Sequence, residues 1–165
     1  MGPLTRRSAR GFTLLEILVV VAIVAIASAA VALAFTGSDR DAAMREARRF
    51  AGALEHAASR AQARAETLGV SAEGNAWRFW RRDADSGRWQ VLSDPDDILS
   101  PHALPDGMLV RPLTYAGREI AAETILPLRA TGRNEPVTFE LAARDTTVAL
   151  ATDPLNRITL VPAAP

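Results

Sequence analysis

The feature that most constrains this chain is an apolar run over residues 12–35, whose only polar side chains are Thr13, Glu16 and Ser28. As a helix, the run would be roughly 36 Å long, and the hydrocarbon core of a membrane is about 30 Å thick. Three arginines precede it, at positions 6, 7 and 10, and no acid stands before Glu16. By the positive-inside rule, this pattern predicts a membrane helix with a cytoplasmic N-terminus and a translocated remainder.

Two simpler explanations of the run remain open. A cleaved secretory signal peptide would carry an Ala-x-Ala site, and Ala27-Ser28-Ala29 has that form. The apolar run continues past this site, however, and Glu16 places an acid where a signal peptide should be apolar. A plain membrane anchor would explain the length but not Glu16, because inserting a carboxylate costs about 2.5–3.5 kcal/mol. The acid therefore indicates a specific role.

The start of the run reads Gly11-Phe12-Thr13-Leu14-Leu15-Glu16, after a short arginine-rich leader. This segment closely resembles the processing site of type IV pilin-like proteins, the prepilins and pseudopilins. The resemblance implies that a prepilin peptidase cuts after Gly11 on the cytoplasmic side and that the new terminal Phe12 is N-methylated. It also matches Glu16 to the acid at the fifth mature position, which serves filament assembly.

Elementary chemistry is consistent with these roles. Gly11 has no side chain, so a peptidase can approach the Gly11–Phe12 bond closely. Cleavage would expose a cationic amine on Phe12, and Glu16 would lie one helical turn away, within reach of that amine or of a neighbouring subunit's amine. An unpaired charge in a filament core is costly, so this ion pair could select the axial register of the subunits.

A second helical segment is expected after the apolar run. Gly37 and the capping residues around it predict a break, and a new helix is expected to begin near Asp41. Gly69 is the expected C-cap. Since no proline interrupts the region, the two helices could also be nearly continuous, with Gly37 as the flexible point. Apolar side chains recur at helical spacing beside Phe50, at Met44, Ala47, Ala51, Leu54, Ala58, Ala61, Ala65 and Leu68.

From residue 70 onward, short β-like runs replace the helical period, and nine of the ten prolines follow residue 94. Residues 76–81 and 88–92 flank a turn-rich link and predict a hairpin. Further strands are expected at 108–114, 124–128, 137–141, 147–151 and 157–161. The predicted fold class is α+β and pilin-like, with one long N-terminal helix packed on an antiparallel β-sheet domain.

This interpretation divides the chain into four parts. A leader peptide covers residues 1–11, and a transmembrane and filament-core helix covers residues 12–37. A periplasmic amphipathic helix covers residues 38–69, and a periplasmic β-rich domain covers residues 70–165.

No constellation for catalysis is convincing, and we infer that the chain is not an enzyme and needs no cofactor. The absence of cysteine excludes thiol chemistry and disulfides. Asp83-x-Asp85-x-Gly87 resembles part of a calcium loop, but a hairpin turn is favoured. Asp94, Asp96 and Asp97 could hold calcium, but a solvated turn is again favoured. The three tryptophans and the arginines around them could suit single-stranded nucleic acid, although alternation between core and solvent explains them better.

Beyond the N-terminus, the chain resembles the minor pseudopilin H family of the type II secretion system. The segments that carry this resemblance are 48–65, the Trp/Arg strand leading to Trp89, Leu104-Pro105-Asp106-Gly107, Pro136-x-x-Phe139-x-Leu141 and Asp153-x-Leu155-x-Arg157-Ile158. The resemblance implies a single-pass inner-membrane precursor with a periplasmic C-terminal domain. After assembly it would lie near the tip of the pseudopilus, in contact with the major pseudopilin and other minor pseudopilins. The apex member of the family typically departs at the fifth mature position, so Glu16 argues against that assignment.

Two alternative functions for the chain remain open. A type IV minor pilin for DNA uptake or motility would favour a basic surface. Removal of residues 1–11 would leave 19 − 3 = 16 basic and 19 acidic side chains, a net charge of −3, so no nucleic-acid partner is expected. A soluble periplasmic protein with a cleaved signal peptide would instead begin near Ala29.

Overall fold

The computed structural model describes residues 14–93, 98–131, 133–144 and 146–162, with the side chains of residues 30–38 and 162 excepted. The chain separates into two compact units, residues 1–37 and residues 38–165. Helix α1 (Leu14–Arg64) is assigned as one helix of 51 residues that includes Gly37. The predicted break and second helix start near Asp41 are therefore wrong, and the continuous alternative is observed. A single glycine costs a helix only about 1 kcal/mol, which is too little to end it.

The C-terminal end of α1 also differs from the prediction. The helix ends at Arg64, and Ala65 takes the left-handed conformation, with φ of 52°. The end is closed by a hydrogen bond from the Glu66 amide to the Ala61 carbonyl and by an ion pair between Arg60 and Glu66 at 2.8 Å. Gly69, the expected C-cap, lies instead inside strand β1 (Leu68–Glu73).

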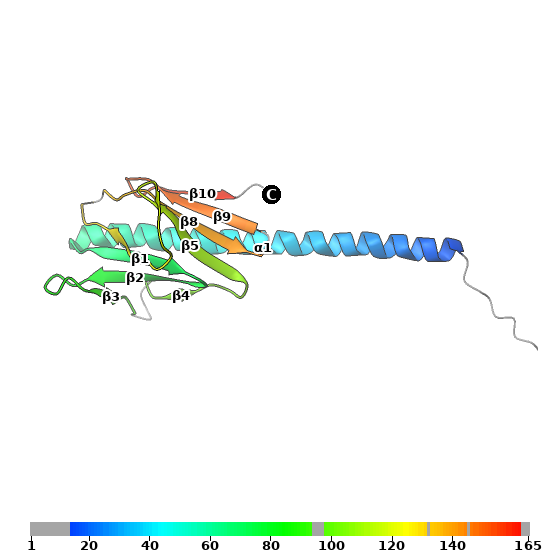
Figure 1. Ribbon diagram of the computed structural model, residues 1–165, viewed down its shortest axis with the longest axis horizontal. Helices are drawn as coiled ribbons and strands as arrows, with labels where there is room; N and C mark the ends of the chain where they lie inside the picture. The colour runs from blue at the N-terminus through cyan, green and yellow to red at the C-terminus, as the bar shows by residue number, and fades with distance from the viewer. Residues whose placement is uncertain (1–13, 94–97, 132, 145, 163–165) are drawn as a thin grey trace, which may run out of the picture. The chain divides into compact units, whose positions relative to one another are not determined.

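Two antiparallel sheets make up the β-rich part (Figure 1). The first has the order β3-β2-β1-β7, with β4 paired to β2; its further strands are β2 (Ala76–Arg82), β3 (Trp89–Val91), β4 (His102–Ala103) and β7 (Leu126–Leu128). The second has the order β10-β9-β8-β5-β6; its strands are β5 (Met108–Tyr115), β6 (Arg118–Glu119), β8 (Val137–Ala143), β9 (Thr146–Thr152) and β10 (Ile158–Pro162).

The strand predictions are largely confirmed. The expected hairpin is β2 paired with β3, and the five later strands correspond to β5, β7, β8, β9 and β10. Strand β1 was not predicted because the apolar period of the preceding helix continues to Leu68 and Gly69 then resembles a C-cap. The short strands β4 and β6 were missed as well, because two residues are too few to show a period.

Phe50 occupies the centre of the core. The phenyl ring stacks on Trp77 of β2, with ring centroids 4.7 Å apart, and meets Phe139 of β8 edge-on at 5.0 Å. The sequence placed Phe50 beside the apolar stripe rather than on it, and Ala65, expected in the stripe, is exposed. Apart from Phe50 and Leu54, the buried face of α1 is made of alanine, which lets both sheets approach the helix; the face comprises Ala43, Ala47, Phe50, Ala53, Leu54, Ala57, Ala58 and Ala61.

Candidate functional site

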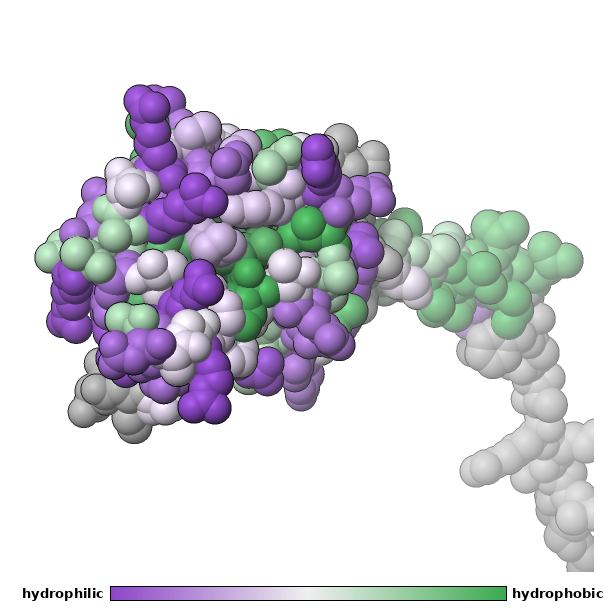
Figure 2. Space-filling model, turned by 60° about the vertical axis from the view of Figure 1, so that its left-hand side comes forward, coloured by the Kyte–Doolittle hydropathy of each residue, from purple (hydrophilic) through white to green (hydrophobic). Residues whose placement is uncertain are grey.

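The described N-terminal part of α1 exposes apolar side chains at positions all round the helix. Figure 2 shows one face of this apolar surface. Leu14 is 84% exposed, Leu18 is 63% exposed and Ile26 is 70% exposed. A helix that is apolar all round is stable only when lipid or other protein surrounds it. This surface is therefore the first candidate site for assembly.

The two polar side chains described within this segment, Glu16 and Ser28, differ in their surroundings. The Ser28 hydroxyl donates a hydrogen bond to the Val24 carbonyl at 2.8 Å, so its hydrogen bond is satisfied within the helix. Glu16 lies in the first turn of α1 and is exposed, at the end where the helix dipole favours a negative charge. Glu16 is thus a carboxylate carried by an otherwise apolar surface.

The predicted processing site and membrane helix are only partly covered by the structure. Gly11 and Phe12 lie outside the described residues, and side chains of the apolar run are described from Leu14 to Ala29. Judged on the described residues, no helix has both the length and the apolar content that a membrane span requires.

In the Asp83 turn, which resembles part of a calcium loop, the Asp83 carboxylate forms hydrogen bonds within the turn itself. Asp83 accepts hydrogen bonds from the Ser86 amide at 2.8 Å and from the Ser86 hydroxyl at 2.6 Å. These bonds lower the pKa of Asp83. Gly87 closes the turn with φ of 66°. The hairpin-turn prediction is confirmed, and over the described residues no group of three or more acids and histidines is placed to hold a metal ion. Asp94, Asp96 and Asp97 lie outside that description.

The three tryptophans take part in packing on both faces of the first sheet. Trp77 is buried against α1, whereas Trp80 and Trp89 lie on the opposite face and are partly exposed. The Trp80 indole donates a hydrogen bond to the Ser71 hydroxyl at 2.8 Å. The ring of Trp89 lies over Gly69, where a Cβ atom would be only 2.9 Å from that ring. The predicted alternation between core and solvent is confirmed.

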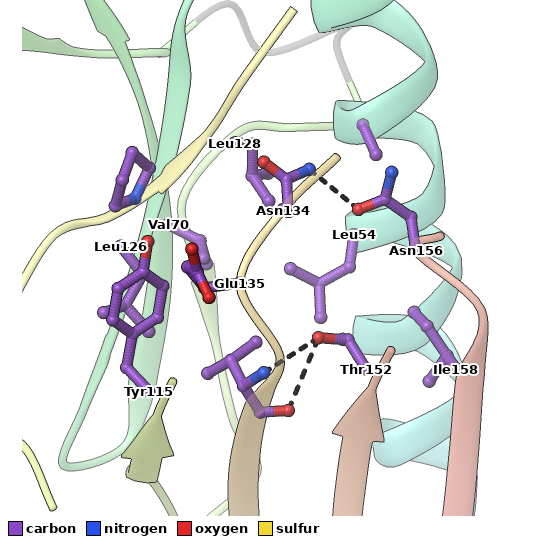
Figure 3. Close-up of a pocket in the computed structure, with 13 residues that line it drawn as sticks. Leu54, Val70, Tyr115, Leu126, Leu128, Asn134, Glu135, Thr152, Asn156 and Ile158 are labelled. Carbon is purple, nitrogen blue, oxygen red and sulfur yellow. Dashed lines mark hydrogen bonds between the residues drawn. The ribbon is translucent and has the colours of Figure 1, made fainter. Parts of the chain in front are cut away.

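One small cavity opens where α1, β7 and the ends of β8 and β9 meet (Figure 3). Its volume is about 20 Å³, which is room for about one water molecule and far below the 300 Å³ or more of ordinary ligand pockets. Beside it, the buried Asn134 accepts a hydrogen bond from the Arg129 amide and donates one to Asn156, both at 2.7 Å. This cavity is therefore a packing defect rather than a ligand site.

Asn134 was not singled out from the sequence, although an isolated Asn before Glu-Pro is a recognisable turn signal. The neighbouring β9–β10 turn contains the C-terminal motif Asp153-x-Leu155-x-Arg157. Asp153 accepts hydrogen bonds from the amides of Leu155 and Arg157 and from the Arg157 guanidinium, and Asn156 takes a φ of 62°. The motif therefore has a structural role that orients β10.

Comparison with known families gives two matches on separate parts of the chain. The prokaryotic N-terminal methylation motif matches residues 6–32, which include Gly11, Phe12 and Glu16. The family of the type II transport protein GspH matches residues 46–159. The second match covers most of the unit that contains both sheets.

Two curated relatives are both named type II secretion system protein H. The chain is 35% identical to type II secretion system protein H of Aeromonas hydrophila, over 64% of this chain and 57% of that protein. It is 36% identical to type II secretion system protein H of Escherichia coli K12, over 58% of this chain and 64% of that protein. The chain thus spans roughly three fifths of the length of these two relatives.

Solved structures share the fold. The crystal structure of the minor pseudopilin EpsH from the type II secretion system of Vibrio cholerae superposes with a TM-score of 0.61 at 18% identity, over 76% of this chain and 98% of that one. The solution structure of Escherichia coli GspH gives 0.58 at 18% identity, over 75% and 90%. Because the family match extends over more than half of the chain, this protein belongs to the type II transport protein GspH family.

Proposed function

We propose that this protein is a minor pseudopilin, a structural subunit near the tip of the type II secretion pseudopilus that supports protein export across the outer membrane. The observation that carries the proposal is a helix segment exposed and apolar on all sides, with Glu16 as its one carboxylate, in a chain of the GspH family. Such a surface suits first a lipid environment and then the packed helical core of a filament.

Processing would precede assembly. The prepilin peptidase would cut the precursor between Gly11 and Phe12, and N-methylation would follow at Phe12. The match of residues 6–32 to the prokaryotic N-terminal methylation motif supports processing at this site. Before extraction, the helix over residues 12–37 would cross the inner membrane once and place the β-rich domain in the periplasm.

Assembly would then use Glu16 to set the register. In the filament core, the carboxylate of one subunit would pair with the terminal amine of the same chain or of its neighbour. A shift along the axis would leave both charges unpaired in an apolar setting, which costs several kcal/mol. The major pseudopilin and other minor pseudopilins are the expected neighbours.

The role is mechanical rather than catalytic. The side chains that could have suggested chemistry, Asp83 and the tryptophans, are used in a turn and in packing. The driving energy for filament growth would come from the cytoplasm, outside the part of the chain that carries the two sheets.

The N-terminus of the mature protein tests this function. The chain is purified from membranes of cells that produce the whole secretion system, and its first residue is read by Edman chemistry and mass spectrometry. We expect N-methyl-Phe12, and a bulky substitution, Gly11→Val, should leave the precursor uncut. A mature chain beginning near Ala29 would instead establish the signal-peptide alternative. Export of a secreted enzyme is then measured in cells lacking this chain, and we expect it to fall.

A further inference from the structure

A groove of about 600 Å³ lies between α1 and the segment that leads into β4. Arg48, Arg49 and Gly52 of α1 form one wall, and Ser100 and His102 form the other, with Trp77 among the lining residues. Its size is in the range of sites that hold several groups of a partner. The groove is thus large enough to admit side chains of another protein.

The wall opposite the helix is rigidly held. The His102 Nε2 lies 2.9 Å from the Glu46 carboxylate, and the imidazole packs on Trp77 with ring centroids 4.3 Å apart. Leu99 is fully buried and anchors the segment that precedes β4. Because this wall is already fixed, a ligand loses little free energy to ordering the wall's side chains, and this favours binding.

Gly52 forms an open position in the groove. A Cβ at this residue would meet nothing within 4 Å, and the helical backbone there needs no glycine. Glycine in a helix interior is less favourable than alanine by about 1 kcal/mol. The packing of this chain does not use the absent side chain, so the free space suits the close approach of another molecule.

The lining residues that the structure describes include two arginines, Arg48 and Arg49, and no acid. Arg48 and Arg49 are exposed, and across the described residues neither guanidinium has a carboxylate within 4.0 Å. Glu46, the acid nearest in sequence, is engaged by His102. On the helix, the positions three and four residues from Arg48 hold no acid, since they are Met44, Arg45, Ala51 and Gly52. A guanidinium binds a carboxylate through two parallel hydrogen bonds, so an acidic side chain is the group that suits each of these arginines.

We propose that this groove docks an acidic segment of a neighbouring pseudopilus subunit, with an Asp or Glu carboxylate on Arg48 and Arg49 and with its backbone against Gly52. The partner's identity as a filament subunit rests on the proposed function, whereas the carboxylate chemistry of the groove does not. The docked carboxylate would be directional, because guanidinium forks fix the plane of the group that they bind.

The absence of lysine from the chain makes a clean test available. Arg48→Lys keeps the positive charge and introduces the only side-chain amine. A water-soluble carbodiimide couples an amine to a carboxylate in direct contact, takes up the water that is lost and leaves as a urea. Membranes from cells with the complete secretion system are treated, and the full-length chain is followed by immunoblot and by mass spectrometry of the linked peptides. Arg118→Lys, exposed in β6, is the matched control.

We expect Arg48→Lys to give an intermolecular adduct through an Asp or Glu of another protein, with a yield about tenfold above that of Arg118→Lys. Equal coupling by the two variants, or coupling of the amine introduced at residue 48 only to carboxylates of its own chain, would overturn the docking proposal. An adduct in a chain that proves dispensable for export would support the groove while refuting the proposed function. If export depends on the chain but no adduct forms at residue 48, the docking proposal is refuted and the proposed function is supported.

A second pair of variants tests the shape of the groove. In the Arg48→Lys background, Gly52→Leu fills the open space and should lower the adduct about tenfold. Gly52→Ala, which adds only one carbon, should retain most of it. Both variants are expected to fold, since nothing lies within 4 Å of the new Cβ and Gly52 faces the open groove, which would take the remaining carbons of leucine. Undiminished coupling in Gly52→Leu would overturn the placement of the partner against α1.

Discussion

The phenyl ring of Phe50 stacks on the indole ring of Trp77, with centroids 4.7 Å apart and planes inclined by 27°. The same phenyl ring meets Phe139 edge-on, and all three side chains are at most 1% exposed. One residue of α1 thereby joins β2 of the first sheet to β8 of the second. Aromatic contacts of this kind contribute about 0.5–1.5 kcal/mol each beyond the apolar area that they bury.

Phe50→Ala should therefore destabilise the protein by about 3–5 kcal/mol, through lost burial and the cavity left behind. Phe50→Leu, which keeps most of the volume, should cost clearly less. Urea unfolding of the full-length protein in detergent, followed by tryptophan fluorescence, measures both. A loss below about 1 kcal/mol for Phe50→Ala would contradict the central position of this side chain.

Two glycines should respond in opposite directions to the same substitution. A Cβ at Gly69 would lie 2.6 Å from Ile125 Cγ2 and 2.9 Å from the Trp89 ring, so Gly69→Ala should destabilise the protein by about 1–3 kcal/mol. Gly52→Ala meets no neighbour and should stabilise it by about 0.5–1 kcal/mol. Thermal unfolding of the two variants decides this, and a loss at Gly52 would show that its backbone requires glycine.

The β9–β10 turn should make stability depend on acid pH. Hydrogen bonds from the Arg157 amide, and then from the Arg157 side chain and the Leu155 amide, hold the pKa of Asp153 below its ordinary value of 3.8. A depressed native pKa adds stability that is present above the unfolded pKa and is lost as the pH falls through the native one. The gap in stability between wild type and Asp153→Asn should thus close in acid. A carboxyl titration midpoint at or above 3.8 by NMR would contradict this.

Glu16→Ala should leave cleavage at Gly11 intact but strongly reduce incorporation into the pseudopilus and export. Removing one partner of a buried ion pair costs about 3–5 kcal/mol. Glu16→Gln should fail similarly because it lacks the charge, whereas Glu16→Asp should retain part of the function. Sheared filament fractions and secreted enzyme activity provide the measurement. Full incorporation of Glu16→Ala would rule out a register-setting role for this carboxylate.

Much of the architecture could be predicted because it depends on neighbours along the chain. The link between β2 and β3 is a local turn that Asp83 and Gly87 close, and β5, β8, β9 and β10 show alternating or β-branched patterns. The division into two sheets could not be predicted. It depends on pairings such as Leu68 with Leu128, whose members are sixty residues apart and show no local sign of each other.

The candidate sites divide in the same way. The N-terminal methylation motif and the apolar run are made of consecutive residues, so the sequence by itself determined them, together with the fold class. The tertiary structure alone decided that Phe50 is the centre of the core, that Gly69 lies under Trp89, and that Arg48 and Arg49 share a groove with His102. Those relationships arise when separate elements pack together, and hydrophobic periodicity records whether a side chain is buried but not which distant partner it meets.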